Sequence, residues 1–393
     1  MINLWHDATA QDCRSALALR AYSSRLIGSD RALVLYGGGN TSLKQNGVLH
    51  VKATGADLAA VSEEHFTALD LAALRALFQN GQMPDAELMR RIDTCKLDPA
   101  APRPSIETQL HATLPGAYVE HAHADAVLAD ADAACAAAFG DLAPVVPYRH
   151  SGAELARACK QVYEHAASTH TIGLILAFHG VVAFGNSARE SYDNLRHLVT
   201  LAENYLQQHG AQPLAIQPAK AELADNTLVT SLRNTVSACA GFPLATHVVC
   251  TPETLAYARR TDIAALSQQG PPTPQHAVYT KRVPLLGADV AAYAARYRAY
   301  LDRTLGPAAN GRIDAAPRIA LSPDFGLCAF GVDAHHAAVA AEIYLHDIDI
   351  IGRASKHGDY RSASEQDIAR AELDYGGFEQ RLRDRMATAS LDN

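Results

Sequence analysis

Residues 117–123, Ala-Tyr-Val-Glu-His-Ala-His, form a predicted β-strand that carries a histidine pair. His121 and His123 are two residues apart, so their imidazoles point to the same face of an extended strand. Both rings can therefore reach a single metal ion at the usual distance of about 2.0–2.1 Å. Taken alone, such a pair is a weak signal, because histidines also occur in strands as ordinary hydrogen-bonded residues.

A third histidine strengthens the metal hypothesis. Two further strands are predicted at Ile172–Phe178 and Val181–Phe184, with a bend at His179-Gly180 that can carry the His179 imidazole across to the pair. Three histidines leave one coordination position open, which is typical of catalytic rather than structural zinc sites. We therefore expect one divalent ion at His121, His123 and His179.

A carboxylate precedes the histidine pair. Glu107 lies in a predicted helix, Ser105–Leu114, with His111 one turn later on the same face. Glu107 is a candidate for acid/base catalysis or for a fourth metal ligand. The alternative is structural: a glutamate that pairs with His111 or that the helix dipole favours at the N-terminus.

A glycine-rich loop is the other candidate for ligand binding. A predicted strand, Ala32–Tyr36, runs into Gly-Gly-Gly-Asn at 37–40, where backbone N–H groups can approach an anion because glycine has no Cβ. The loop matches neither the P-loop nor the dinucleotide fingerprint, so no nucleotide is implied. Thr54-Gly55 is a second turn of this kind. A tight turn without a ligand explains either loop equally well.

The predicted elements divide the chain into two domains. An amphipathic helix is expected at Ala8–Ile27, and another begins at Ser187, which has capping-box spacing. A polar, proline-containing run after Gly210 suggests the boundary, and we assign residues 1–215 and 216–393 to the two domains. In the second half we expect a strand at Thr246–Cys250, a hairpin at Arg318–Gly331 and a helix at Ala334–Tyr344. No internal sequence repeat is evident.

Composition limits the class of protein. The 393 residues include 34 basic and 42 acidic side chains, a net charge of -8, which argues against a nucleic-acid partner. With 48% apolar and 19% charged residues, the chain is expected to fold. No apolar run is long enough for a membrane span and no signal peptide is recognised, so a cytoplasmic protein is predicted. The seven cysteines are widely spaced and predict neither disulfides nor a thiolate zinc site.

These motifs, in this order, resemble the class II aldolase/adducin family of metal-dependent sugar-phosphate aldolases. The resembling segments are GGGNTS at 37–42, PSIETQLHATL at 104–114, VEHAHADAVL at 119–128, LILAFHGVVAFG at 174–185 and GPPTPQHAVYTK at 270–281. Within the family, the sequence is most similar to the aldolase portion of long bifunctional rhamnulose-1-phosphate aldolase/alcohol dehydrogenase proteins, without the dehydrogenase half.

The resemblance implies a fold and a set of site residues. It implies an α/β fold, namely a three-layer α/β/α catalytic domain followed by a smaller α/β domain. It implies that His121, His123 and His179 bind the catalytic ion, with zinc expected first and manganese or cobalt as alternatives, and that Glu107 is the acid/base. Residues at positions that contact a substrate phosphate are Asn40, Thr54, Gly55 and Ser105. His276, after the Gly-Pro-rich loop, is a further candidate.

The implied reaction is reversible cleavage of a ketose 1-phosphate to dihydroxyacetone phosphate and an aldehyde. In this reaction the ion acts as a Lewis acid and no Schiff-base lysine is needed. Ile106 stands where the short aldolases have a second serine, which leaves open whether the substrate carries a phosphate. An epimerase or decarboxylase on the same metal site, and an adducin-like binding protein without catalysis, are the alternatives. The resemblance further implies a homo-oligomer, and the missing half suggests a separate aldehyde dehydrogenase or reductase as partner.

Overall fold

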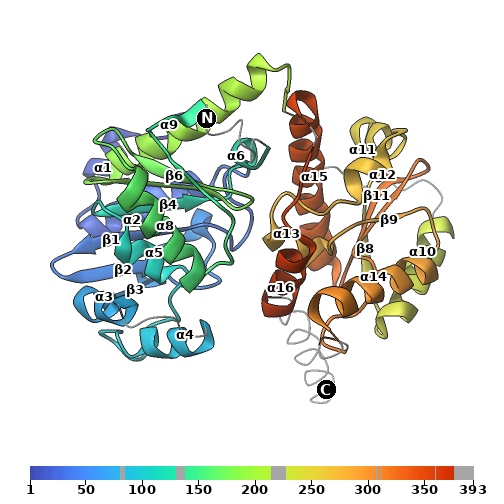
Figure 1. The fold of residues 1–393 in the computed structure, drawn as a ribbon, viewed down its shortest axis with the longest axis horizontal. Coiled ribbons are helices and arrows are strands. Elements are labelled where there is room, and N and C mark those ends of the chain that lie inside the picture. Colours follow the sequence, from blue (N-terminus) through green and yellow to red (C-terminus); the bar gives the residue numbers. More distant parts are fainter. Residues whose placement is uncertain are drawn as a thin grey trace. The chain divides into compact units, whose positions relative to one another are not determined.

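The chain folds into two compact units in the computed structural model: unit 1, Met1–Gly210, and unit 2, Ala211–Asn393 (Figure 1). The structure describes residues 1–79, 85–129, 138–213, 227–306, 309, 311–358 and 360–375. The predicted domain limit between residues 215 and 216 lies outside these residues. In the described part of the chain, no helix is both long enough and apolar enough to cross a lipid bilayer.

Unit 1 is built on a mixed sheet whose strand order is β3-β2-β1-β4-β7-β6-β5. The strands are β1 Asn40–Gln45, β2 Val48–Lys52, β3 Phe66–Asp70, β4 Tyr118–Ala122, β5 Val145–Val146, β6 Gly173–Leu176 and β7 Gly180–Gly185. The helices are α1 Asp7–Gln11, α2 Ala16–Gly28, α3 Leu71–Gln79, α4 Asp85–Asp93, α5 Thr108–Thr113, α6 Asp125–Ala129, α8 Ala153–Ala166 and α9 Ala188–Gln208. Short 3₁₀ turns lie at Leu58–Ala60 and Glu63–His65. Strand β4, which contains His121 and is followed directly by His123, occupies the middle of the sheet.

Helices cover both faces of this sheet. On one face, Glu120 of β4 is hydrogen-bonded to Arg20 of α2 and to Ser191 of α9. On the other face, Val119 packs in an apolar cluster with residues of α5 and α8. Adjacent residues of a strand point to opposite faces, so α2 with α9 and α5 with α8 form separate layers. The predicted α/β fold is thus confirmed, and His121 lies on the α5 side, two residues from Val119.

Two predicted elements of unit 1 are wrong. Residues 32–36 form turns rather than a strand, because the Asp30 carbonyl accepts hydrogen bonds from the backbone N–H groups of Leu33 and Val34. Tyr36 then adopts a left-handed conformation, with φ of 52°, which a strand does not allow. The predicted helix at Ala8–Ile27 is two helices, since Ser15 caps a new N-terminus by accepting from the Ala18 N–H.

Unit 2 has its own sheet, with strand order β8-β11-β10-β9. Its strands are β8 Ala245–Val249, β9 Leu285–Leu286, β10 Ile319–Ser322 and β11 Gly326–Gly331. Its helices are α10 Thr227–Ala240, α11 Pro252–Ala258, α12 Ile263–Ser267, α13 Pro274–Thr280, α14 Val290–Leu305, α15 Ala334–His357 and α16 Glu365–Tyr375. This smaller α/β unit is as predicted, although α15 extends well beyond the predicted end at Tyr344.

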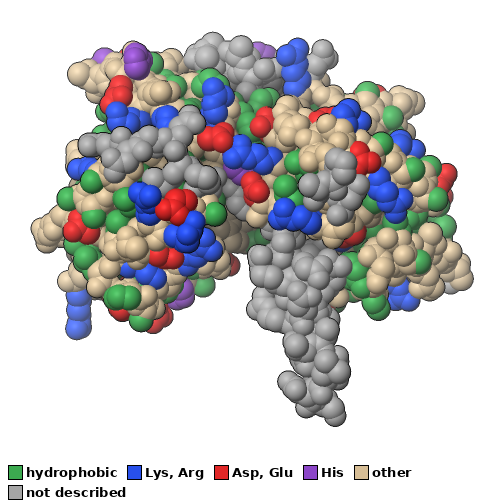
Figure 2. Space-filling view, turned by 60° about the horizontal axis from the view of Figure 1, so that its bottom comes forward, with side chains coloured by type: hydrophobic (Ala, Val, Ile, Leu, Met, Phe, Trp, Pro, Cys, Tyr) green, Lys and Arg blue, Asp and Glu red, His purple; other side chains and the backbone are tan. Residues whose placement is uncertain are grey.

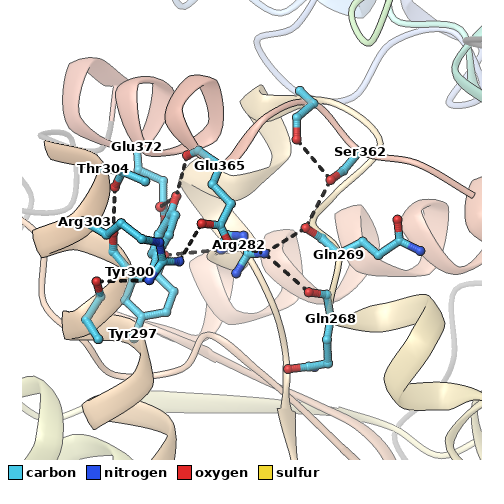
Figure 3. A network of polar contacts seen from close by, with 12 residues as sticks. Gln268, Gln269, Arg282, Tyr297, Tyr300, Arg303, Thr304, Ser362, Glu365 and Glu372 are labelled. Carbon is cyan, nitrogen blue, oxygen red and sulfur yellow. Dashed lines mark hydrogen bonds and ion pairs between the residues drawn. The ribbon is translucent and has the colours of Figure 1, made fainter.

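A polar network ties α16 to α14 in unit 2 (Figure 3). Glu365 of α16 lies 2.8 Å from the Arg282 guanidinium and 2.5 Å from that of Arg303 in α14. Deeper in the unit, the Glu372 carboxylate accepts a hydrogen bond from the Tyr300 hydroxyl at 3.2 Å and another from Tyr297. Burial raises the pKa of Glu372, and these two donors oppose that effect. The network therefore fixes α16 against α14.

Charges are mixed on the molecular surface. On the face shown in Figure 2, lysine and arginine side chains lie among aspartate and glutamate side chains rather than in one basic patch. This distribution agrees with the overall net charge of -8. It gives no support, on that face, to electrostatic binding of nucleic acid.

Candidate metal centre

Three histidines from different parts of unit 1 meet at one point. His121, His123 and His179 each offer one ring nitrogen, and these nitrogens lie within 4.8 Å of one another. The Nε2 atoms of His121 and His123 are 3.1 Å apart, and the His179 ring centroid lies 4.8 Å from that of His121. The structure therefore brings together all three of the predicted ligands.

Two glycines allow the three histidines to come close to one another. His179 sits in the turn between β6 and β7, and Gly180 follows with φ of 143°. A Cβ on Gly180 would lie 2.2 Å from the Ala122 carbonyl oxygen, so only glycine lets the turn approach the end of β4. Gly39 is similar, since its Cβ would lie 2.8 Å from the His121 carbonyl oxygen. The glycine-rich loop thus packs directly beside the histidines.

The hydrogen bond of His121 and the burial of His179 suit a divalent metal ion. The Nδ1 atom of His121 lies 3.1 Å from the Val181 carbonyl oxygen, to which it can only donate, so Nε2 keeps its lone pair for the site. Burial lowers the pKa of His179 well below its usual range and keeps that ring neutral, which is the form that binds metals. The His179 Nδ1 atom is buried without a hydrogen-bond partner among the described residues. This donor set fits an ion such as zinc.

Glu107 lies beside the histidines, as predicted. Its carboxylate oxygens are 3.4 Å from Nε2 of His121 and 3.3 Å from Nε2 of His179. Burial alone would raise the pKa of Glu107, but the imidazole of His121 and a hydrogen bond from Asn40 outweigh it and lower the pKa. Glu107 is therefore a buried carboxylate next to the proposed ligands.

Glu107 does not pair directly with His111, which was one of the structural alternatives for this residue. Glu107 is the N-cap residue before α5, and its side chain turns toward β1. There the Asn40 Nδ2 atom donates to Glu107 at 2.6 Å, while the Asn40 carbonyl oxygen is hydrogen-bonded to Nε2 of His111. The other ring nitrogen of His111, Nδ1, lies 2.8 Å from the Ser42 hydroxyl. Asn40 thus links Glu107 to His111.

This chain of hydrogen bonds has one consistent direction. Burial lowers the pKa of His111 to about 3, so its ring is neutral and has a single N–H. Since Asn40 gives its NH₂ to Glu107, its oxygen must accept from His111, and Nδ1 of His111 must then accept from Ser42. The Asn40 amide is therefore held with its donor aimed at the carboxylate. His111 acts as a positioning residue for Glu107.

Replacing His111 with phenylalanine tests this positioning. We expect kcat to fall about 10²-fold, since small displacements of a catalytic group cost about that much, whereas metal content stays at the wild-type level. Steady-state kinetics and plasma mass spectrometry measure the two quantities. His50→Phe, which removes a β2 imidazole outside this hydrogen-bonded chain, is the control. A wild-type kcat in His111→Phe would show that Asn40 needs no such support.

The predicted phosphate-binding residues lie around the same loop. Gly55 is a neighbour of Gly37, and Ser105 accepts a hydrogen bond from the Glu107 backbone N–H at 3.2 Å. The Thr54 hydroxyl donates to the Pro104 carbonyl oxygen at 2.9 Å. The hydrogen bonds of Asn40 go to Glu107 and His111, so its phosphate contact, like those of Thr54, Gly55 and Ser105, stays a prediction.

Lys52 lies beside the glycine-rich loop and was not singled out from the sequence. It ends β2, is buried, and its Nζ atom lies 3.5 Å from the Gly37 carbonyl oxygen at the glycine-rich loop. Burial lowers the pKa of Lys52 to about 8, while Asp57 and Glu107 oppose the shift. A signal was present in the sequence, because a lysine stands two residues before the small-residue turn Thr54-Gly55.

His276 lies in unit 2. It is part of α13, and its Nδ1 atom is 2.6 Å from a carboxylate oxygen of Asp347 in α15. Both side chains are buried, so the pair holds these two helices together. The structure gives His276 this contact within its own unit, and its predicted role in catalysis stays a prediction.

Two family descriptions match the chain. "Class II Aldolase and Adducin N-terminal domain" matches residues 19–206, and "Aldolase class II, second domain" matches residues 223–381. The chain belongs to the class II aldolase and adducin family. The family assignment made from the histidine and glycine motifs is thus confirmed, and all three histidines and Glu107 lie within the first matched range.

Relatives of different kinds are found in this family. The chain is 30% identical to a Bacillus subtilis (strain 168) protein named uncharacterised oxidoreductase YuxG, over 93% of this chain and 58% of that protein. It thus spans about three fifths of this curated relative. A class II aldolase domain from Thermoplasma acidophilum is 32% identical, with a TM-score of 0.48 over 52% of this chain and 99% of that one. L-fuculose-1-phosphate aldolase from Thermus thermophilus is 20% identical, with a TM-score of 0.34 over 49% and 98%.

Proposed function

We propose that unit 1 is a divalent-metal-dependent aldolase that reversibly cleaves a ketose 1-phosphate, of the rhamnulose 1-phosphate type, to dihydroxyacetone phosphate and an aldehyde. The observation that carries this proposal is the meeting of three imidazoles with the Glu107 carboxylate, which lies 3.3–3.4 Å from two of them. Membership of the class II aldolase family supports it. Zinc is the proposed ion, since zinc suits three imidazole ligands, and manganese and cobalt are alternatives.

The chemistry divides between the ion and the protein. A divalent ion at these imidazoles would supply a Lewis acid for the negative charge that develops on substrate oxygens as the carbon–carbon bond breaks. Glu107 transfers a proton to or from the carbon of dihydroxyacetone phosphate at which the carbon–carbon bond breaks or forms. Because its lowered pKa makes the carboxylate its resting form, Glu107 removes this proton directly in condensation and must first take up a proton in cleavage.

The glycine-rich loop and Lys52 supply the place for the phosphate. The Lys52 ammonium group is buried and lies 3.5 Å from the carbonyl oxygen of Gly37, which is itself a neighbour of Gly55, so it can neutralise an anion at this loop without competing water. Ile106, which replaces a serine of the short aldolases, packs against an apolar cluster instead of offering a hydroxyl. In this proposal the charge of Lys52 replaces the lost hydrogen bond.

Lys52 gives a testable pH dependence. With a pKa of about 8, its ammonium form is present below pH 8 and is lost above it, so kcat/KM for a phosphorylated ketose is expected to fall above about pH 8. Lys52→Met should raise KM about tenfold to a hundredfold, the worth of a charged hydrogen bond, and abolish this alkaline limb. Lys52→Arg keeps the charge and should move the limb to higher pH. An unchanged limb in Lys52→Met would exclude this assignment.

Metal content and a substrate panel test the proposed function. Plasma mass spectrometry of the purified protein should find about one divalent ion per chain, lost in His121→Ala. Phosphorylated and free ketoses are then assayed with trapping of the aldehyde product. Formation of an epimer, or of CO₂ from a sugar acid, without aldehyde would replace the aldolase by an epimerase or a decarboxylase. Absence of an ion after supplementation would leave an adducin-like binding protein.

The remaining proposals concern the protein's setting. We place it in the cytoplasm as a homo-oligomer, as the family resemblance implies. The aldehyde product needs a consumer, and a separate aldehyde dehydrogenase or reductase is the proposed partner. Size-exclusion chromatography with light scattering and co-purification test these two points.

A further inference from the structure

The sheet of unit 2 has the same topology as half of the sheet of unit 1. The order β8-β11-β10-β9 in unit 2 corresponds to β4-β7-β6-β5 in unit 1. In both series the first two neighbours pair antiparallel, the next two pair antiparallel, and the last two pair parallel. Equivalent helices follow, with α9 after β7 and α15 after β11, and with α8 before β6 and α14 before β10.

The strand register repeats as well. Gly173 pairs with Ala183 in unit 1, and Ile319 pairs with Ala329 in unit 2, a shift of 146 residues from 173 to 319 and from 183 to 329. The same shift relates the other three residue pairs of the two hairpins. Two unrelated sheets with the same strand order are not expected to share the same hairpin register. The register depends on loop length and on which side chains face the core.

Close contacts after the hairpin recur at the same shift. A Cβ on Gly185 would lie 2.7 Å from the backbone nitrogen of Ser191, and a Cβ on Gly331 would lie 2.2 Å from that of Ala337. The helix that makes each contact is capped by a side chain at the equivalent position, Ser187 in α9 and Asp333 in α15. At the sequence level, the tripeptide Ala-Phe-Gly is repeated at this shift, at 183–185 and 329–331.

We infer that unit 2 is a second copy of the metal-binding half of the aldolase sheet in which all three metal ligands have been replaced. His121 pairs with Val182, and Val248 pairs with Cys328 at the equivalent place on β11, so Val248 is the counterpart of His121. Two residues later, Cys250 corresponds to His123. Phe325 precedes Gly326 as His179 precedes Gly180.

Two of the three replaced positions have become part of an apolar core, whereas Cys250 is exposed. Val248 and Phe325 are both buried in the cluster that packs under α10 and α14, whereas their counterparts in unit 1 form the polar site. Unit 2 therefore keeps the frame that positions the ligands but offers no histidine at these places, and of the three replacements only the exposed Cys250 has a side chain that can bind a metal. The structural repeat is independent of the proposed function of unit 1. The expectation that the wild-type chain binds one ion does rest on that proposed function.

Rebuilding the ligands tests the inference. The triple variant Val248→His, Cys250→His, Phe325→His is made in the wild type and in His121→Ala, and Co²⁺ binding is followed by visible absorption and plasma mass spectrometry. We expect one more ion per chain than in the parent protein in both backgrounds. The matched control replaces Val249 instead of Val248. Val249 belongs to the cluster on the opposite face of the sheet, so this control should gain no ion.

The outcomes separate the two proposals. A folded triple variant that binds no additional ion, or a control that binds as well as the triple variant, overturns the inference. An ion in the triple variant but none in the wild type would support the repeat and contradict the proposed metal site of unit 1. If circular dichroism shows that the triple variant does not fold, Val248→His/Cys250→His, which leaves Phe325 in the core, is compared with Val249→His/Cys250→His. Equal Co²⁺ binding by these two would overturn the inference.

Discussion

Replacing Glu107 with glutamine is expected to lower kcat by about 10²- to 10⁴-fold and to leave the metal in place. The amide has nearly the shape of the carboxylate but cannot carry the proton, and general acid–base groups contribute about this much to rate. The three imidazoles supply the metal-binding nitrogens by themselves, so the ion content should stay at the wild-type level. Steady-state kinetics together with plasma mass spectrometry measure both effects.

A shorter carboxylate provides the matched control for Glu107. Glu107→Asp keeps the acid but retracts it by one methylene, so its kcat should lie between those of the wild type and the glutamine variant. Loss of the ion in Glu107→Gln would instead make Glu107 a fourth ligand, the alternative considered from the sequence. Wild-type turnover in the glutamine variant would remove Glu107 from the mechanism.

Replacing Glu120 with leucine is expected to destabilise unit 1 by about 3–5 kcal/mol. The Arg20 Nη2 atom lies 2.7 Å from a carboxylate oxygen of Glu120, and both side chains are 0% exposed. Without Glu120 the guanidinium group remains charged inside the protein, which costs far more than the pair gains by forming. The Ser191 hydroxyl loses its acceptor as well. Urea denaturation measures the change in unfolding free energy.

The sole tryptophan makes this measurement specific to unit 1. Trp5 lies against Tyr22 and Tyr192, with ring centroids 5.3 Å and 5.9 Å away, so its fluorescence reports the unfolding of that unit. The double variant Arg20→Met/Glu120→Leu removes both charges and should recover most of the lost stability. Equal stability of the single variant and the wild type would show that Arg20 has another compensating partner.

Local patterns predicted part of the site well. The two-residue spacing of His121 and His123 needs only the period of a strand, and Ser187 begins α9 as its capping pattern indicates. The strand predicted at 32–36 failed because apolar residues alone do not distinguish a strand from turns that the Asp30 carbonyl organises. Helix α15 was predicted too short: it continues beyond Tyr344 through the buried polar residues Asp347, Asp349 and Arg353.

Sequence patterns could not predict contacts between residues that are far apart in the chain. Asn40 and Glu107 are separated by 67 positions, and His111 and Asn40 by 71. Their arrangement depends on β1 lying beside β4, a pairing that neither strand specifies by itself. The repeat in unit 2 also escaped notice, because it is preserved in register and close contacts while the side chains on its strands have changed.

Two sheets of the same pattern in one chain create a problem of folding order. Strand β8 pairs with β11, yet the two are separated by most of unit 2, and β4 and β7 are separated in a comparable way in unit 1. During folding, β4 and β8 must therefore each wait for a hairpin, and the hairpin of the other unit has the same register and the same Ala-Phe-Gly ending. Synthesis from the N-terminus separates these events in time, since domains generally fold in the order in which they are made. On the ribosome, β4 finds β7 before β10 and β11 exist, whereas a chain refolded from denaturant has both hairpins present at once and is exposed to cross-pairing.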